Sequence, residues 1–147
     1  MNCLLKAGMF NCYFNNFKQN PMCAAATPQI KGMSPLLIVS DLECAVAYYQ
    51  QNLGFNLDFR YADFYAGINR DGYSIHLKQG EPSSGERKNK ADNRDPEIIF
   101  SVDCIGELYE EFLGRSAGIV QSLRDMPYGK EFYAADPDGN VVAFVES

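Results

Sequence analysis

The chain has 147 residues, of which 46% are hydrophobic, so it can bury one good core but not two independent cores of full size. Its net charge of −6 disfavours a nucleic-acid or polyphosphate partner and permits a cationic one. No apolar run approaches the roughly 18 residues that a membrane-spanning helix needs, so no membrane partner is expected.

The cysteines and the N-terminal residues bear on the compartment. The five cysteines show neither CxxC spacing nor an even count, which favours a reducing cytoplasm over a zinc module or a disulfide framework. Residues 1–32 lack periodicity, and we expect a disordered or strand-swapped extension. One alternative is that the biological start is Met22 or Met33, so that this sequence starts upstream of it. Another is a secretory signal, which the asparagines in this stretch disfavour.

The first half of the folded region predicts a strand, a helix and three strands. Asp41 stands at the N-cap position of the helix, and Gly54 ends the helical spacing. Weak alternation and turn residues separate the strands that follow. The predicted elements are a strand at 35–39, a helix at 42–53, and strands at 55–61, 64–68 and 73–78.

Alternation in the last of these strands divides its side chains between two faces. Ile75 and Leu77 point toward the helix, whereas Ser74, His76 and Lys78 point to the opposite face of the sheet. His76 is the only histidine of the chain. We therefore expect His76 on the face that would carry chemistry.

The second half repeats the first after a polar linker. Residues 80–95 contain no large apolar side chain and predict a solvated linker, or a lid over a ligand. Cys104 is expected as an unusual N-cap, and the Asp, Pro, Asp, Gly and Asn of residues 136–140 predict a turn rather than a calcium loop. The predicted elements are a strand at 97–102, a helix at 105–113, and strands at 118–123, 131–135 and 141–146.

Landmarks of the two halves recur at a fixed offset of 63 residues. The stretch that begins at Leu36 corresponds in this way to the stretch that begins at Ile99. One offset of this size indicates two copies of one βαβββ unit rather than a solenoid. The expected fold class is α+β, with residues 33–147 as a single domain made of modules 33–79 and 96–147.

These motifs, in their order and spacing, resemble the vicinal oxygen chelate superfamily, which includes glyoxalase I, extradiol dioxygenases, fosfomycin-inactivating enzymes and bleomycin-resistance proteins. The resemblance covers about residues 33–147 and implies two βαβββ modules whose mixed sheets form a U-shaped cleft, the glyoxalase/bleomycin-resistance fold. The matching stretches are 39–43, 48–49, 53–55, 100–103, 127–132 and 136–140.

The resemblance also implies four equivalent strand positions that hold a divalent metal in the family's enzymes. Carried over to this sequence, they fall at Ser34, His76, Glu97 and Ala143. Only His76 and Glu97 could bind a metal there, and a catalytic metal normally has about three protein ligands. A shift of one residue in the second half would replace Glu97 by Pro96 and leave one ligand.

A similar loss of ligands is typical of the bleomycin-resistance branch, whose members are homodimeric and sequester a cationic antibiotic. The chain resembles that branch, and its nine tyrosines and ten phenylalanines suit stacking and cation–π contacts. The leading hypothesis is a cytoplasmic, metal-independent homodimer that binds a cationic or aromatic small molecule without cofactor. We expect the ligand to contact His76, Glu97, Tyr65, Tyr128, Tyr133 and Ser74.

Two other classes of function stay open. One is a metal-dependent lyase, isomerase or dioxygenase that uses His76, Glu97 and a third ligand from the 79–95 loop or the N-terminal extension. The other is a structural or regulatory subunit whose cleft is filled by its own N-terminal residues. A third metal donor near His76 and Glu97 would distinguish the enzyme from the binding protein.

Overall fold

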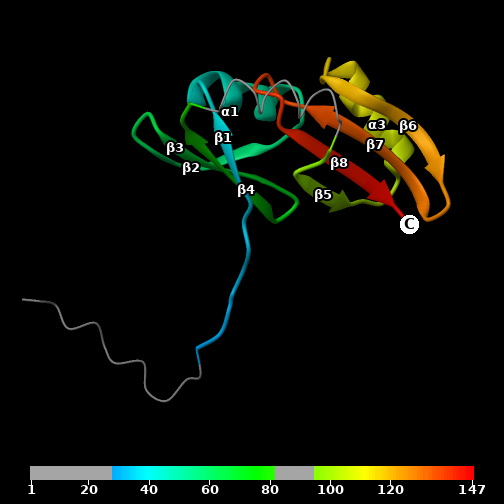
Figure 1. Cartoon of the computed structure of the whole chain (residues 1–147), viewed down its shortest axis with the longest axis horizontal. Coiled ribbons are helices and arrows are strands. Elements are labelled where there is room, and N and C mark those ends of the chain that lie inside the picture. Colours follow the sequence, from blue (N-terminus) through cyan, green and yellow to red (C-terminus); the bar gives the residue numbers. More distant parts are fainter. Residues whose placement is uncertain (1–27, 82–94) are drawn as a thin grey trace, which may run out of the picture. The chain divides into compact units, whose positions relative to one another are not determined.

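The computed structural model describes residues 28–81 and 95–147 (Figure 1). The chain divides into two units, Met1–Lys31 and Gly32–Ser147, and all helices and strands of the described residues belong to the second. The expected N-terminal extension lies almost entirely outside the described residues, and so does most of the expected linker at 80–95.

The first module folds as predicted, with one strand, one helix and three strands. Its four-stranded sheet has the order β1-β4-β3-β2, in which β1 runs parallel to β4 and the other pairs are antiparallel. The helix α1 contacts β2, β3 and β4 of this sheet. The elements are β1 (Leu36–Val39), α1 (Leu42–Gln51), β2 (Asn56–Tyr61), β3 (Tyr65–Arg70) and β4 (Tyr73–Gln79).

The second module repeats this topology. Its sheet has the order β5-β8-β7-β6, with β5 parallel to β8, and α3 contacts β6, β7 and β8. The helices begin at Leu42 and Ile105, which reproduces the predicted offset of 63 residues. The elements are β5 (Ile98–Ser101), α3 (Ile105–Gly114), β6 (Ile119–Met126), β7 (Gly129–Ala135) and β8 (Val141–Glu146).

Each helix covers one face of its own sheet, and this arrangement makes the core. Ile75 and Leu77 are fully buried, as the alternation of their strand predicts. In the second module Phe132 and Phe144 are buried against Phe112 of α3, with ring centroids 5.6 and 5.0 Å from its ring. The opposite face of each sheet is therefore left for other contacts.

The starts of the two helices differ. Asp41 caps α1 as predicted, since its Oδ1 accepts a hydrogen bond of 2.9 Å from the Cys44 amide. Cys104 is the N-cap residue of α3, as expected, but its backbone is left-handed, with φ of 52°, and its side chain makes no cap bond. Its amide donates instead to Oε1 of Glu146, 2.8 Å away.

The strand predicted at 118–123 is longer than its apolar pattern indicates. It extends to Met126, which pairs with Gly129 across a short turn. The end of this edge strand contains polar residues such as Arg124 and Asp125, so the apolar pattern of the sequence does not reveal it. Backbone pairing with β7 holds these residues in the sheet. The turn before β7 is correspondingly tighter than predicted.

The turn at 136–140 holds the two modules together through buried polar groups. The backbone amides of Asp138 and of Asn140 each donate a hydrogen bond of 2.9 Å to Oδ1 of Asp136. These bonds confirm the predicted turn. Nδ2 of Asn140 donates to the Ile38 carbonyl at 3.1 Å, and the Ser40 hydroxyl donates to Asp138 at 2.6 Å. The first module thus contacts this turn directly.

Candidate ligand-binding site

A row of side chains crosses the face of the first sheet that points away from α1. Strand pairing aligns Phe59, Gly67, His76 and Leu36 from β2 to β1. Because Gly67 has no side chain, the Phe59 ring lies over it and meets the His76 ring edge-on, with centroids 5.3 Å apart and planes at 86°. The result is a surface of an aromatic ring and an imidazole.

Tyr65 lies beside His76 on this face, so two residues predicted from the sequence come together. Its hydroxyl is 2.7 Å from Nδ1 of His76. Within the described part of the chain nothing hydrogen-bonds to Nε2 of His76, which is left for a ligand atom that donates or accepts. Tyr61 extends the same surface, with its ring centroid 5.4 Å from that of Phe59. We call Phe59, Tyr61, Tyr65 and His76 the aromatic wall.

Ser74 and Glu97, two further predicted residues, line one pocket of about 460 Å³ between the modules. We call it the Ser74 pocket; Ile99 of β5 contributes an apolar side to it. Ser74 accepts a hydrogen bond of 3.1 Å from Nδ2 of Asn69. Because Ser74 and His76 are two residues apart on one strand face, the pocket opens about 7 Å from the aromatic wall.

Tyr128 and Tyr133, the last two predicted residues, converge elsewhere, on Glu131 of β7. This carboxylate is only 2% exposed and accepts from Tyr128 at 2.8 Å, Tyr133 at 3.0 Å and Arg124 at 2.5 and 2.9 Å. Burial raises the pKa of the Glu131 carboxyl, but the hydrogen bonds from Tyr128, Arg124 and Tyr133 outweigh it and lower the pKa overall. These tyrosines are therefore engaged in a charged cluster on the second sheet.

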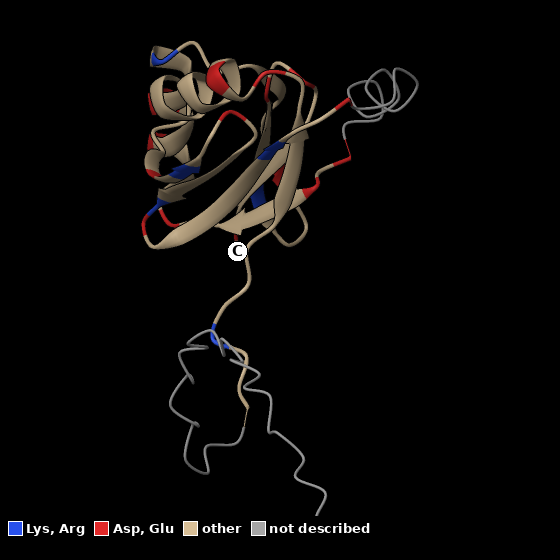
Figure 2. Cartoon of the chain, turned by 90° about the vertical axis from the view of Figure 1, so that its left-hand side faces the viewer, with Lys and Arg blue, Asp and Glu red and all other residues tan. Residues whose placement is uncertain are grey.

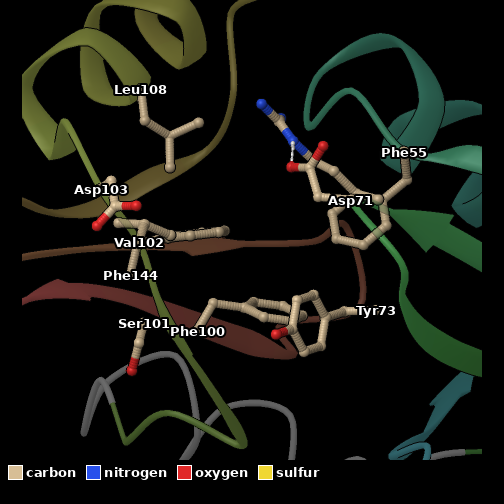
Figure 3. A pocket seen from close by; sticks show the side chains of 10 residues that line it. Phe55, Asp71, Tyr73, Phe100, Ser101, Val102, Asp103, Leu108 and Phe144 are labelled. Atoms are coloured by element: carbon tan, nitrogen blue, oxygen red, sulfur yellow. Dashed lines mark ion pairs between the residues drawn. The ribbon is translucent and has the colours of Figure 1, made fainter.

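A second pocket, of about 340 Å³, lies between the β3–β4 turn and the connection from β5 to α3. We call it the Phe55 pocket. Figure 3 shows Phe55, Asp71 and Tyr73 of the first module on one side, facing residues of the second module that include Phe100 and Leu108. Its lining combines aromatic and aliphatic side chains with three charged ones, namely Asp103 and the ion pair of Arg70 with Asp71.

The strand register shows which side chains lie beside the four positions that could hold a metal. The residues paired on adjacent strands are Leu36 with His76 in the first module and Ile99 with Ala143 in the second. Ser34 and Glu97 each lie two residues before these paired positions. Only His76 of the four paired side chains has a donor atom, and residues 28–81 and 95–147 contain no group of three or more His, Cys, Asp or Glu side chains that could hold a metal ion. The described residues alone thus bring together fewer than the roughly three protein ligands of a catalytic metal.

Several site residues were missed by reasoning from sequence. The alternation in β2 placed Phe59 and Tyr61 on one face, but it did not tell which face. Glu131 looks like an ordinary strand residue, since its three partners lie at separate positions of β6, the turn and β7. Tyr73 and Phe100, which line both pockets, become neighbours only when the two modules pack.

In the view of Figure 2 the Lys and Arg positions (blue) of the described residues lie among acidic and uncharged ones. No helix of residues 28–81 and 95–147 is long and apolar enough to cross a membrane.

Comparison with known proteins identifies a family. The sequence model of the Glyoxalase/Bleomycin resistance protein/Dioxygenase superfamily matches residues 31–144. A search of curated proteins gave no match.

Solved structures share the fold at low sequence identity. UcmS2 is 21% identical with a TM-score of 0.66, covering 81% of this chain and 100% of its own. A bleomycin-binding protein from bleomycin-producing Streptomyces verticillus, solved with copper(II)-bleomycin, is 23% identical with a TM-score of 0.64 and coverages of 82% and 99%. The fosfomycin resistance protein FosX from Listeria monocytogenes is 16% identical with a TM-score of 0.59 and coverages of 81% and 95%.

Proposed function

Because the chain belongs to the glyoxalase/bleomycin resistance protein/dioxygenase superfamily, we propose that it is a metal-independent binding protein of the bleomycin-resistance type. It sequesters a cationic or aromatic small molecule in a cleft completed by a second copy of the chain. Binding requires no covalent chemistry and no cofactor. The protein acts in the cytoplasm, without a nucleic-acid or membrane partner.

The observation that carries this proposal is the composition of the strand positions that hold a metal in the family's enzymes. They fall here at Ser34, His76, Glu97 and Ala143, of which only His76 and Glu97 could bind a metal, fewer than the roughly three protein ligands of a catalytic metal. The neighbouring positions Leu36 and Ile99, which pair with His76 and Ala143, are apolar, and this suits a binding surface. The proposal therefore assigns this face to ligand binding rather than to metal chemistry.

The aromatic wall supports a ligand with rings or a positive charge. Aromatic faces attract a cation by about 0.5 to 2 kcal/mol each, and they stack on flat ligand groups. Nε2 of His76 adds one directional hydrogen bond, and Tyr65 fixes the ring through Nδ1. The acidic balance of the chain, −6, also favours a cation. Binding of copper(II)-bleomycin by the structural neighbour from Streptomyces verticillus is consistent with this ligand class.

Exposed apolar side chains support the homodimer. Leu36 is 49% exposed and Ile99 is 64% exposed, and both lie on the face that the helices leave uncovered. Ile38 and Tyr61 of the same face are also exposed. Exposed apolar side chains that gather on one face can mark an interface, and closed two-fold pairing is the commonest symmetry of homo-oligomers.

Titration with bleomycin and with a panel of cationic aromatic compounds tests the proposal. Isothermal titration calorimetry on EDTA-treated protein should detect at least one ligand, and Tyr61→Ala should weaken its binding by about 0.5 to 2 kcal/mol. Leu113→Ala, which removes an exposed apolar side chain on α3, is the matched control and should leave binding unchanged. Binding that requires added metal would point instead to the metal-dependent lyase, isomerase or dioxygenase that uses His76 and Glu97.

The third class of function, a subunit whose cleft holds its own N-terminal residues, concerns residues outside the described ranges. Deletion of residues 1–32 distinguishes it from the proposal. The binding protein should keep its affinity after the deletion, whereas a self-filled cleft should gain ligand binding only then.

A further inference from the structure

The Phe55 pocket and the Ser74 pocket adjoin each other. Tyr73, Phe100 and Ser101 line both of them, so one wall separates the two spaces. The pockets measure about 340 and 460 Å³, respectively. Small-molecule sites typically occupy about 300 to 1,000 Å³, so either pocket alone suits a fragment and both together suit a longer ligand.

The wall between the pockets is held weakly at Tyr73. Tyr73 is 67% exposed, and its one ring contact among residues 28–81 and 95–147 is an edge-on approach to Phe100, with centroids 6.4 Å apart and planes at 70°. The Tyr73 hydroxyl makes no hydrogen bond within the described part of the chain. Tyr73 is the first residue of β4 and follows Asp71 and Gly72, which both have positive φ. Rotation of its side chain therefore breaks no buried contact.

The wall is firmer at Phe100. Its ring stacks on Phe144 with centroids 5.8 Å apart and planes at 22°, and it lies 6.2 Å from Phe55. Phe55 and Phe144 are both buried in the core. Of the two rings in the wall, Tyr73 is thus the one that can move aside.

The two pockets differ in chemistry. The Phe55 pocket is lined by Phe55, Phe100, Phe144 and Leu108, whose side chains suit an aromatic group, and by Asp103 and the ion pair of Arg70 with Asp71 (Figure 3). The lining of the Ser74 pocket includes Ser74 and Glu97, and a hydroxyl and a carboxylate are groups that bind an ammonium group. A molecule that carries both groups, joined by a flexible chain, matches the pair of pockets.

We propose that the two pockets form one elongated site for an aryl-alkylamine, in which the aryl group enters the Phe55 pocket and the amine binds beside Ser74 and Glu97. Tyr73 is the residue whose side chain moves aside for the ligand, because the alkyl chain passes where its ring now stands. This inference rests on the proposed binding function and names a ligand class and a second subsite for it.

A homologous series of phenylalkylamines tests the site, from benzylamine to 6-phenylhexylamine. The longest member should bind the full chain about tenfold more tightly than benzylamine, because only it reaches both pockets. Leu108→Trp should fill the Phe55 pocket and abolish this gain, and Glu97→Gln should weaken the amines by a similar factor. Tyr73→Phe should bind as the unchanged protein does, and Tyr73→Ala should retain or raise affinity for the longest member.

Controls separate a lost site from a lost fold. Leu113→Trp places the same bulky group on α3 at an exposed position, and thermal melts verify that each variant folds. Amide chemical-shift changes at both Ser74 and Leu108 during titration with 6-phenylhexylamine give a direct readout. Equal affinities along the series, or equal effects of the two tryptophan variants, would overturn the elongated site. If panel compounds bind while the series does not, this inference alone fails; if neither binds, the proposed function fails as well.

Discussion

The Phe59 ring occupies the space that a Cβ atom at Gly67 would need. Gly67 lies between Phe59 and His76 in the strand register, so its missing side chain lets the ring reach the imidazole. A glycine in a strand interior often marks such a close approach. The aromatic wall thus depends on a residue that contributes no side chain to it.

Gly67→Ala should destabilise the fold, because the added methyl group overlaps the ring. Overpacking of this kind costs about 1 to 3 kcal/mol in the free energy of unfolding, measurable by urea denaturation. In the double variant with Phe59→Leu the cost should shrink, since the overlapping ring is gone. Gly106→Ala adds a methyl group in open space on α3 and is the control. Additive effects of Gly67→Ala and Phe59→Leu would contradict this packing.

Glu131→Gln should lower stability at neutral pH and change its pH dependence. The folded-state pKa of Glu131 lies below the ordinary value of 4.5, so its contribution is present above pH 4.5 and is lost as pH falls through the folded-state pKa. Hydrogen bonds to a charged group are worth about 1.5 to 3 kcal/mol. Melts from pH 7 to pH 3 should therefore show the variant and the unchanged protein converging at low pH. A constant difference over this range would contradict the charged cluster.

Asn140→Ala should loosen the junction of the two modules. The variant loses the donations of Nδ2 to the Ile38 carbonyl and to Oδ2 of Asp136, which is buried. We expect a loss of about 1 to 3 kcal/mol in the free energy of unfolding. Asn56→Ala removes an exposed amide of β2 and should change stability by no more than about 0.5 kcal/mol. Equal effects of the two substitutions would show that the turn does not hold the modules together.

Leu36→Lys should shift the chain from dimer to monomer, because a charge on the uncovered sheet face opposes its burial. Leu113→Lys changes a side chain of similar exposure, 45% against 49%, on the helix side and should leave the dimer intact. Sedimentation equilibrium measures the two association constants. A monomeric unchanged protein, or equal dissociation by both variants, would contradict the proposed interface.

The fold could be predicted from sequence because its signals are local and repeated. The helix start could be predicted from the capping residue Asp41, the buried strand face from the alternation around Ile75, and the turn from the residues at 136–140. The second module repeats the same order of elements. The end of β6 and the conformation of Cys104 were not predicted, since pairing with β7 and the amide bond to Glu146 determine them.

The candidate site was harder to predict, because it depends on which faces meet. The six residues named from the sequence fall into three pairs rather than one cluster, and each pair lies in its own surroundings: Tyr65 with His76, Ser74 with Glu97, and Tyr128 with Tyr133. Phe59 contacts His76 in the aromatic wall, and Tyr73 contacts Phe100 between the two pockets. Tertiary packing brings these residues together, and the spacing in the sequence does not reveal it.

Ligand binding by metal-free protein tests the central proposal most directly. The untagged protein is treated with EDTA, its metal content is verified by mass spectrometry, and the cationic aromatic panel is titrated with and without zinc, manganese, nickel or ferrous iron. We predict one dissociation constant that does not depend on metal, and a thermal midpoint that rises by several degrees with ligand and not with metal. A stoichiometric metal whose removal abolishes binding would contradict the account and assign His76 and Glu97 to a metal centre.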